Sequence, residues 1–390
     1  MLRDTQGVAR SHAVLPMEYV PIVARFDGAR TCEDIARLAS KEVGERVPVD
    51  VVVRLATELE EALFVEGAPY RRERARIERE FADADVRPAS HAGGAYHGDA
   101  KKLADYIDKE CFGQTNGGGN RGDGSHRAPA SRLLGIVAPH IDPWRGARCY
   151  GEAYGALGAA LPEDADTFVL FGTSHAPMRE PFALCRKAFD TPLGRLEADK
   201  ASIDSIAAAC DFDPYADQFN HKREHSLEFQ AVFLRHLLGK RQARIIPVLA
   251  GLGAEQSNGK SPTHSRAVEK FLHAVRSVVD TKRAVVIAGA DLAHVGPRFG
   301  DATPFDEGER RALDETDRES LDHATRGDAE GFWKHVAADL ETRRVCGLAP
   351  IYSLLRTVAS GAKGMLRHYE QNVDPDEGSI VSHAALGFYG

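Results

Sequence analysis

The run Leu133-Leu134-Gly135-Ile136-Val137-Ala138-Pro139-His140 is almost entirely apolar until it ends in a proline and a histidine. Similar short apolar runs recur at residues 167–172, 243–250 and 284–289. Strands of a parallel sheet that is covered on both faces have this continuous apolar character. Stretches with helical spacing separate the runs. The alternation predicts an α/β fold with a mostly parallel central sheet flanked by helices.

Histidines follow three of these expected strand ends: His140 closes the first run, His175 follows the second, and His294 follows the fourth. Ligands of open α/β sheets bind beyond the carboxyl ends of the strands. Cys346 adds a thiol near the start of an expected helix, whose N-terminus would depress the thiol pKa and favour the ligating thiolate. Taken alone, each residue can also be read as a buried structural one. Together, three histidines and a thiol predict a non-heme transition-metal site.

Asp291 and His294 lie three residues apart in Asp291-Leu292-Ala293-His294. We expect them on a turn that begins a helix, where residues at this spacing face the same way. The carboxylate would then orient the imidazole or stabilise its charged form, as a general acid or base requires. The alternative is a helix-capping aspartate beside a structural histidine.

The length and net charge of the chain limit the number of domains and the kinds of partner that we expect. A chain of 390 residues exceeds what one hydrophobic core usually supports, so we expect about two domains. The net charge of −8 provides no field that would attract nucleic acids or anionic membranes. No stretch reaches the roughly 18–20 apolar residues of a membrane-spanning helix. Because the first residues lack the apolar core of a secretion signal, we expect a cytoplasmic protein.

Several common site types are disfavoured by missing motifs. None of the six cysteines forms a C-x-x-C pair, which argues against a structural zinc knuckle. The chain also lacks a G-x-G-x-x-G fingerprint, a Walker loop and a G-x-S-x-G elbow. Dinucleotide-binding, P-loop NTPase and serine-hydrolase functions are therefore not expected.

The N-terminal part reads as a separate module. After a tail at residues 1–16, we expect a winged-helix-like module and a helical connector at residues 17–84, with a short strand and turn at 64–67. Between residues 17 and 70, six Lys and Arg face eleven Asp and Glu, so DNA binding is not expected. The Gly-rich stretch at 113–131 predicts a surface loop within the main domain at 85–390.

Seven ordered motifs in residues 86–390 resemble those of the Memo family, known in prokaryotes as the B component of the AmmeMemoRadiSam system. The N-terminal module resembles the PqqD-type winged helix instead. The motifs are Arg87-Pro88-Ala89-Ser90-His91-Ala92-Gly93, Ala138-Pro139-His140, Gly172-Thr173-Ser174-His175, Glu224-His225-Ser226-Leu227-Glu228, Ile246-Pro247-Val248-Leu249, Asp291-Leu292-Ala293-His294 and Cys346-Gly347.

The resemblance implies a fold similar to LigB-like class III extradiol dioxygenases, which bind iron(II) with two histidines and a glutamate. It implies His140, His175 and Cys346 as metal ligands, with the cysteine in place of the glutamate. It implies His294 as the acid–base, with Asp291 beside it. Iron(II) is the expected metal and copper the alternative, because this donor set disfavours magnesium and calcium. Radical SAM and AMMECR-type proteins are implied as partners.

The same motifs suggest three pocket residues: His91, His225 and Glu228. Each histidine would either line the pocket or tie loops together. The segment after His140 departs from the family pattern Pro-His-Ala-Gly-Tyr, so one wall of the pocket differs. Two functions remain open: an O₂-using oxidoreductase that acts on a small molecule, and a catalytically silent adaptor that binds a metal or a peptide.

Overall fold

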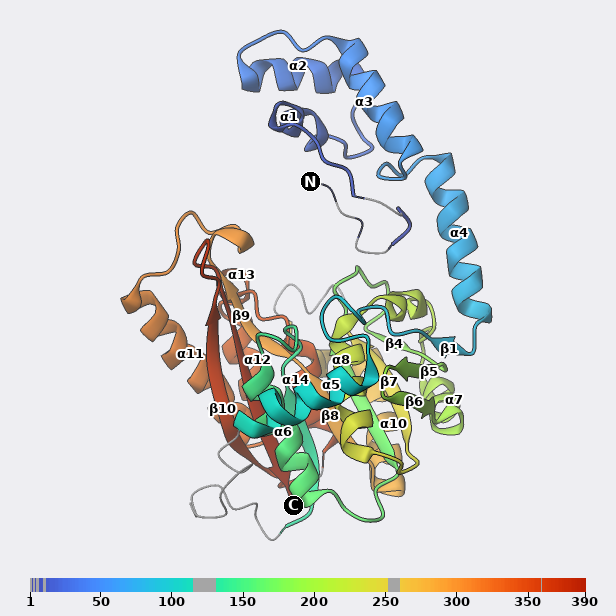
Figure 1. Ribbon diagram of the computed structural model, residues 1–390, viewed down its shortest axis with the longest axis vertical. Helices are drawn as coiled ribbons and strands as arrows, with labels where there is room; N and C mark the ends of the chain where they lie inside the picture. Colours follow the sequence, from blue (N-terminus) through green and yellow to red (C-terminus); the bar gives the residue numbers. More distant parts are fainter. Residues whose placement is uncertain are drawn as a thin grey trace. The chain divides into compact units, whose positions relative to one another are not determined.

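A computed structural model describes residues 2, 4, 7–9, 12–114, 131–251, 260–358 and 360–390. The chain forms two compact units, Met1–Ala84 and Asp85–Gly390 (Figure 1). The Gly-rich stretch predicted to be a loop lies almost wholly outside the described residues. Within the part that is described, no helix is both long and apolar enough to cross a membrane.

The first unit is helical. Thr31 caps α2 by accepting a hydrogen bond from the Asp34 backbone N–H, as the sequence predicts for a helix start at this position. The buried core comes from one face of each of the main helices, with Ile35, Val52 and Leu59 among its members. The helices are α1 (Val20–Val23), α2 (Cys32–Val43), α3 (Val49–Glu61) and α4 (Ala68–Asp83).

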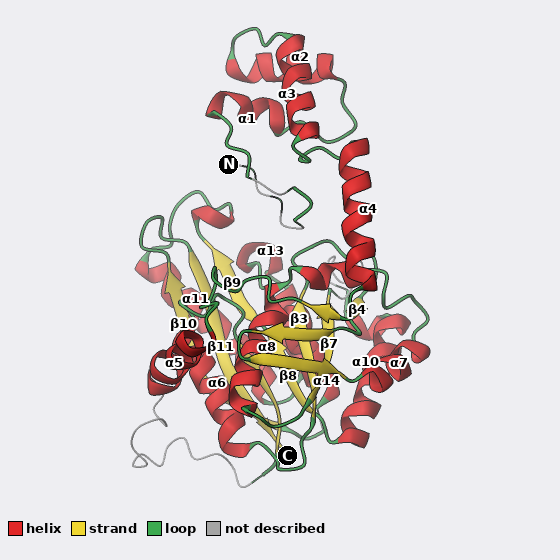
Figure 2. Cartoon of the chain, turned by 45° about the vertical axis from the view of Figure 1, so that its right-hand side comes forward, coloured by secondary structure: helices red, strands yellow, loops and turns green. Residues whose placement is uncertain are grey.

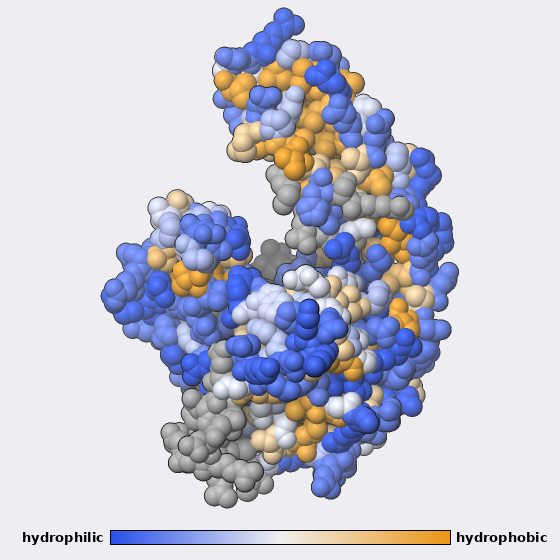
Figure 3. All heavy atoms as spheres, in the orientation of Figure 1, coloured by the Kyte–Doolittle hydropathy of each residue, from blue (hydrophilic) through white to orange (hydrophobic). Residues whose placement is uncertain are grey.

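Two expectations for this unit are wrong. Residues 64–67 form bends and irregular backbone rather than the expected strand and turn, so the hairpin of a winged helix is not made there. The segment 1–16 is more than a tail, because Leu2 pairs with Ala13 and Val8 is fully buried. The unit also exposes apolar side chains, visible as orange atoms in Figure 3. They are Val14, Met17, Val20, Val43, Val49 and Val53.

Deleting residues 1–84 should leave a folded second unit. The second unit has its own hydrophobic core and its own sheet, and every predicted ligand lies within it. We expect the truncated protein to elute as a compact species and to unfold in one cooperative thermal transition, with its metal binding intact. Aggregation or a non-cooperative melt would show that the first unit is needed for the second to fold.

The second unit is built on a mixed sheet that is parallel at its centre, which confirms the predicted α/β class. The strand order is β1-β5-β6-β7-β3-β8-β2-β11-β10, with β4 paired to β7 and β9 to β11. The central strands β7, β3, β8 and β2 run parallel, and the long β10–β11 hairpin adds an antiparallel margin (Figure 2). The strands are β1 (Val86–Arg87), β2 (Leu133–Ala138), β3 (Thr167–Thr173), β4 (Phe182–Leu184), β5 (Ala188–Thr191), β6 (Gly194–Ala198), β7 (Arg244–Ala250), β8 (Val285–Gly289), β9 (Asp291–Val295), β10 (Lys363–Val373) and β11 (Ile380–Tyr389).

Helices cover both faces of this sheet. Helices α6 and α8 contact each other and pack on one face, whereas α7, α10 and α14 pack on the other. The four apolar runs predicted as strands are β2, β3, β7 and β8, each correct to within one residue at either end. The helices are α5 (Ala100–Tyr106), α6 (Ala147–Ala160), α7 (Lys200–Ala209), α8 (His225–Leu238), α10 (Arg266–Lys282), α11 (Glu307–Thr325), α12 (Ala329–Ala337), α13 (Leu340–Arg343) and α14 (Leu348–Thr357).

Candidate metal centre

The carboxyl ends of three neighbouring strands lie side by side. Gly289 at the end of β8 pairs with Ala138 of β2 on one side and with Gly172 of β3 on the other. Because the three strands are parallel and in register, the residues that follow them emerge at the same edge of the sheet. His140 follows β2 and His175 follows β3, so the topology brings these two histidines together.

Two glycines in this row allow helix α8 to approach the sheet. A Cβ atom on Gly289 would lie 2.4 Å from the backbone oxygen of Ser226, and one on Gly172 would lie 2.5 Å from the Ser226 hydroxyl. Both distances are far below van der Waals contact. The missing side chains therefore let the first turn of α8 lie directly over the strand ends, which places His225 beside His140 and His175.

Replacing Gly289 with alanine should therefore displace the first turn of α8 and disturb the metal centre. The new methyl group would overlap the first turn of α8, and overpacking of this kind typically costs about 1–3 kcal/mol. We expect a lower Tm and weaker metal binding. Gly155→Ala in α6 is the matched control, because a Cβ there meets nothing within 4 Å. Equal behaviour of the two variants would contradict the close-approach argument.

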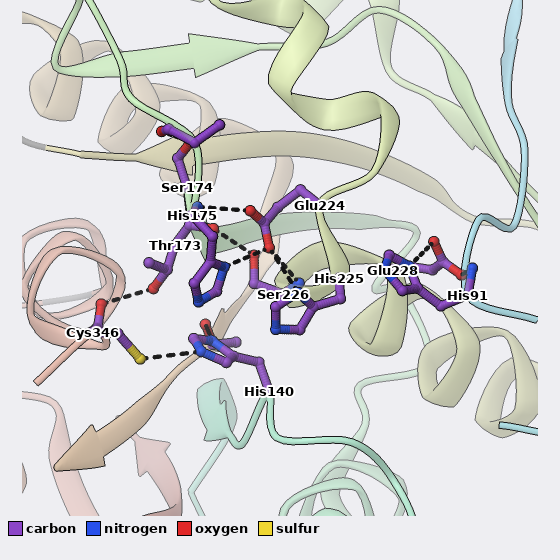
Figure 4. Close-up of polar contacts among 12 residues, drawn as sticks. His91, His140, Thr173, Ser174, His175, Glu224, His225, Ser226, Glu228 and Cys346 are labelled. Carbon is purple, nitrogen blue, oxygen red and sulfur yellow. Dashed lines mark hydrogen bonds and ion pairs between the residues drawn. The ribbon is translucent and has the colours of Figure 1, made fainter. Parts of the chain in front are cut away.

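Glu224 holds two of the three histidines. Its carboxylate accepts hydrogen bonds from the His175 backbone N–H at 2.8 Å and from His175 Nδ1 at 2.9 Å, and it lies 3.4 Å from His225 Nδ1 (Figure 4). It also caps α8 by accepting from the Ser226 N–H at 3.0 Å. One buried carboxylate thus fixes the start of the helix and the orientation of both rings.

The three imidazoles form a compact group of donors. His140, His175 and His225 each offer a ring nitrogen, and these nitrogens all lie within 4.8 Å of one another. The rings of His175 and His225 stack with centroids 4.5 Å apart, and the His140 ring stands edge-on to both. The His140 side chain is 2% exposed, whereas that of His175 is 40% exposed, so the group is anchored in the core and open to solvent on one side.

For His140 and His175, the hydrogen bonds at Nδ1 make Nε2 the basic nitrogen that can bind a metal. His140 Nδ1 lies 3.0 Å from the Gly289 carbonyl oxygen, which can only accept, so Nδ1 carries the proton and Nε2 keeps its lone pair. The same argument applies to His175, whose Nδ1 faces the Glu224 carboxylate. Metal-bound histidines usually donate their second N–H to a carboxylate or carbonyl in this way. The donor set therefore fits a transition-metal ion.

Burial favours neutral rings for His140 and His225, whereas the ionised Glu224 carboxylate draws His175 toward its charged form. Burial lowers the pKa of His140 and lowers that of His225 to about 3. Burial also opposes the charge of His175, but its hydrogen bond and attraction to Glu224 outweigh this and raise the His175 pKa. Burial works against ionisation of Glu224 too, yet its bonds to His175 hold the pKa of Glu224 well below its usual range. Neutral imidazole is the form that binds metals.

Cys346 touches the group at its edge. Its Sγ lies 3.1 Å from His140 Nε2, while Thr173 donates a hydrogen bond to its backbone carbonyl (Figure 4). A sulfur and a nitrogen bound to one tetrahedral metal ion would be about 3.5 Å apart, judging from usual metal–ligand bond lengths. The predicted depression of its pKa is not found: burial raises the pKa of the thiol well above its usual value, and the Asp291 carboxylate adds to this.

Asp291 and His294 lie on strand β9, so the prediction of a turn that begins a helix is wrong. A strand sends residues three apart to opposite sides. Accordingly, the Asp291 carboxylate accepts from the His140 backbone N–H at 2.8 Å and lies 3.6 Å from His140 Nε2. His294 Nδ1 instead faces the Leu292 carbonyl at 3.2 Å. Asp291 is thus bonded to a predicted ligand rather than to its predicted partner, although its charge still acts on His294.

The remaining pocket candidates form a neighbouring network. The His91 ring lies 5.8 Å from that of His225, and its Nδ1 is 3.0 Å from Glu228. Glu228 is fully buried and also pairs with Arg87 and Tyr96. This carboxylate ties the segment around His91 to α8. His91 therefore lies near the metal centre, whereas Glu228 contacts His91 and not the three-histidine group.

The roles of His225 and Glu224 were not predicted from the sequence. His225 was assigned to the pocket, yet it belongs to the three-histidine group, and Glu224 was noted only as part of a motif. The available signal was the pair Glu224-His225 at the start of an amphipathic helix, since an acidic residue there is a common cap. Nothing in the sequence shows that this helix begins over the ends of β3 and β8.

Comparisons with known proteins agree with the motifs. The family model described as Memo-like protein matches residues 87–387. A MEMO1 family protein of Aquifex aeolicus is 25% identical over 392 residues, which is 100% of this chain and 96% of that protein. The MEMO1 family protein TTHA0924 of Thermus thermophilus is 26% identical, with 87% and 93% covered. One of Methanosarcina mazei is 29% identical, with 65% and 85% covered.

Proposed function

Because this chain belongs to the family of Memo-like proteins, we propose that its second unit is a non-heme metal protein that catalyses an oxidation with O₂. The observation that carries the proposal is the group formed by His140, His175 and His225. Three imidazoles that converge at a solvent-exposed edge leave positions on a metal ion free for other ligands. We propose iron(II) as the metal and copper as the alternative, since imidazole suits both.

Different residues of the chain would orient the metal ligands and transfer protons. Glu224 orients His175 and His225, and the Gly289 carbonyl orients His140, so the donors are held before a metal arrives. Bound iron or copper would supply the redox chemistry with O₂. His294 is partly exposed and lies outside the donor group, which suits a residue that moves a proton to or from a substrate. We propose that role for it, and that Cys346 is a further ligand beside His140.

Metal analysis followed by oxygen uptake tests this function. The full chain is purified without oxygen from medium supplemented with iron, copper or zinc, and its bound metal is measured. Oxygen consumption is then followed with catechol-like compounds. We expect about one iron or copper per chain and uptake that depends on it. His273→Ala, which alters an exposed histidine of α10, should match the wild type in both measurements.

The alternative, a metal- or peptide-binding adaptor, uses the same donors. The 40% exposure of the His175 side chain favours it, because a large ligand could reach the group. An adaptor would hold the metal at full occupancy and consume no oxygen with any compound offered. Failure to retain any transition metal would contradict both functions.

A further inference from the structure

His383 on β11 is fully buried, and neither of its ring nitrogens has a hydrogen-bond partner within the described part of the chain. Burial lowers the pKa of His383, so the ring is neutral, with one N–H to donate and one lone pair to accept. Buried polar groups in proteins are nearly always bonded, either to protein or to ordered water. Two partners are therefore needed at this place in the sheet.

The sheet register shows what lies on either side. His383 is directly opposite Asp291 of β9 and directly opposite Glu370 of β10. Opposite residues of antiparallel strands point to the same face, with Cβ atoms about 4.5–5.5 Å apart. The Asp291 side chain is 2% exposed and that of Glu370 is 36% exposed. The three side chains thus form a row that leads from the metal centre toward the surface.

The surroundings of this row are fixed and polar. The preceding residue Ser382 accepts a hydrogen bond from the Ala293 N–H and donates one to Asp317. Helix α6 packs over β10 and β11. The charges that act on His383 besides Asp291 and Glu370 are those of His368 and Arg145.

We propose that ordered water joins His383 to Asp291 on one side and to Glu370 on the other, which makes His383 a positioning residue for Asp291. Asp291 and Glu370 stand opposite His383 in the sheet, but neither carboxylate is within hydrogen-bond distance of its ring, and ordered water bridges polar groups that are separated in this way. Asp291 in turn holds the His140 backbone N–H at 2.8 Å. His383 therefore acts on the orientation of His140 from the far side of Asp291.

The first arm of the test uses the metal-free full chain and is independent of the proposed function. Histidine side-chain NMR of ¹⁵N-labelled protein should show His383 as a neutral ring with a slowly exchanging N–H that is close to bound water. His383→Phe should shift the ring resonances of His140. Trp333→Phe is the control, because it also removes a buried unpartnered N–H but from α12, which packs mainly on α11 and α14.

The second arm rests on the proposed function and uses Co²⁺ as the probe. His383→Phe should weaken Co²⁺ binding by less than the roughly 10- to 100-fold that is usual on removing a group bonded directly to a ligand, because His383 acts through water and Asp291. It should also change the visible absorption of the bound ion. His383→Gln keeps a donor and an acceptor and should restore most of the affinity, and it remains informative if the Phe variant does not fold.

The outcomes separate the two ideas. Unchanged His140 resonances in both His383 variants, or wild-type Co²⁺ affinity and spectrum in His383→Phe, would overturn the positioning role. Equal losses in His383→Gln and His383→Phe would do the same, because a hydrogen-bonding role predicts rescue. If the wild type binds no Co²⁺ while the His140 resonances still shift in His383→Phe, the inference stands and the proposed function fails.

Discussion

Replacing His140 with alanine should reduce bound metal by an order of magnitude or more. His140 is the most deeply buried of the three donors, and its Nε2 lies 3.1 Å from Cys346 Sγ and 3.6 Å from the Asp291 carboxylate. Removing it deletes a metal–ligand bond. Metal content after purification from supplemented medium, together with a Co²⁺ titration, measures the loss. His175→Ala should behave in the same way.

The same measurement decides between two ligand sets. The family resemblance implies His140, His175 and Cys346, whereas the described geometry groups His140 and His175 with His225. A large loss of metal in Cys346→Ala with retention in His225→Ala would support the thiol, because that sulfur already lies 3.1 Å from His140 Nε2. The reverse pattern would make the centre a three-histidine site with Cys346 as a neighbour. Full occupancy in all four alanine variants would refute a metal site here.

His294→Ala should lower kcat by roughly 10²–10⁴-fold once a substrate is known, while metal content stays near that of the wild type. That range is usual for a positioned acid–base. The separation of the two effects is expected because the His294 ring lies outside the group of donors and its Nδ1 is held by the Leu292 carbonyl. Steady-state kinetics and metal analysis on the same preparation provide both values. Loss of the metal in this variant would instead make His294 a ligand.

Asp291→Asn is the companion variant. If Asp291 only tuned His294, the substitution would cause a milder loss of kcat and no loss of metal. The structure adds a second expectation, because the carboxylate holds the His140 backbone and lies near Nε2. A measurable weakening of metal binding is therefore expected too. A variant with normal metal affinity and normal kcat would show that neither contact matters.

Much of the fold could be predicted because its signals are local. Four apolar runs and the helices between them identified the central strands to within a residue, since a strand covered on both faces has few polar positions. The antiparallel β10–β11 margin was not predicted, because most positions of β10 are only partly buried and its pattern lacks that continuous apolar character. The start of β9 was mistaken for a helix, because Asp291-Leu292-Ala293-His294 carries capping residues without showing the strand that pairs with it.

The sequence by itself determined which donors this protein has and at which strand ends they lie. Proximity to a strand end is a local property, so His140 and His175 could be predicted as neighbours from their positions alone. Only the tertiary structure decided that His225 joins them, because that requires α8 to lie over Gly172 and Gly289. Only the tertiary structure likewise showed that Asp291 bonds the His140 backbone and that His383 lies opposite Asp291 in the sheet. These contacts depend on pairing among β9, β10 and β11, which joins residues far apart in the chain.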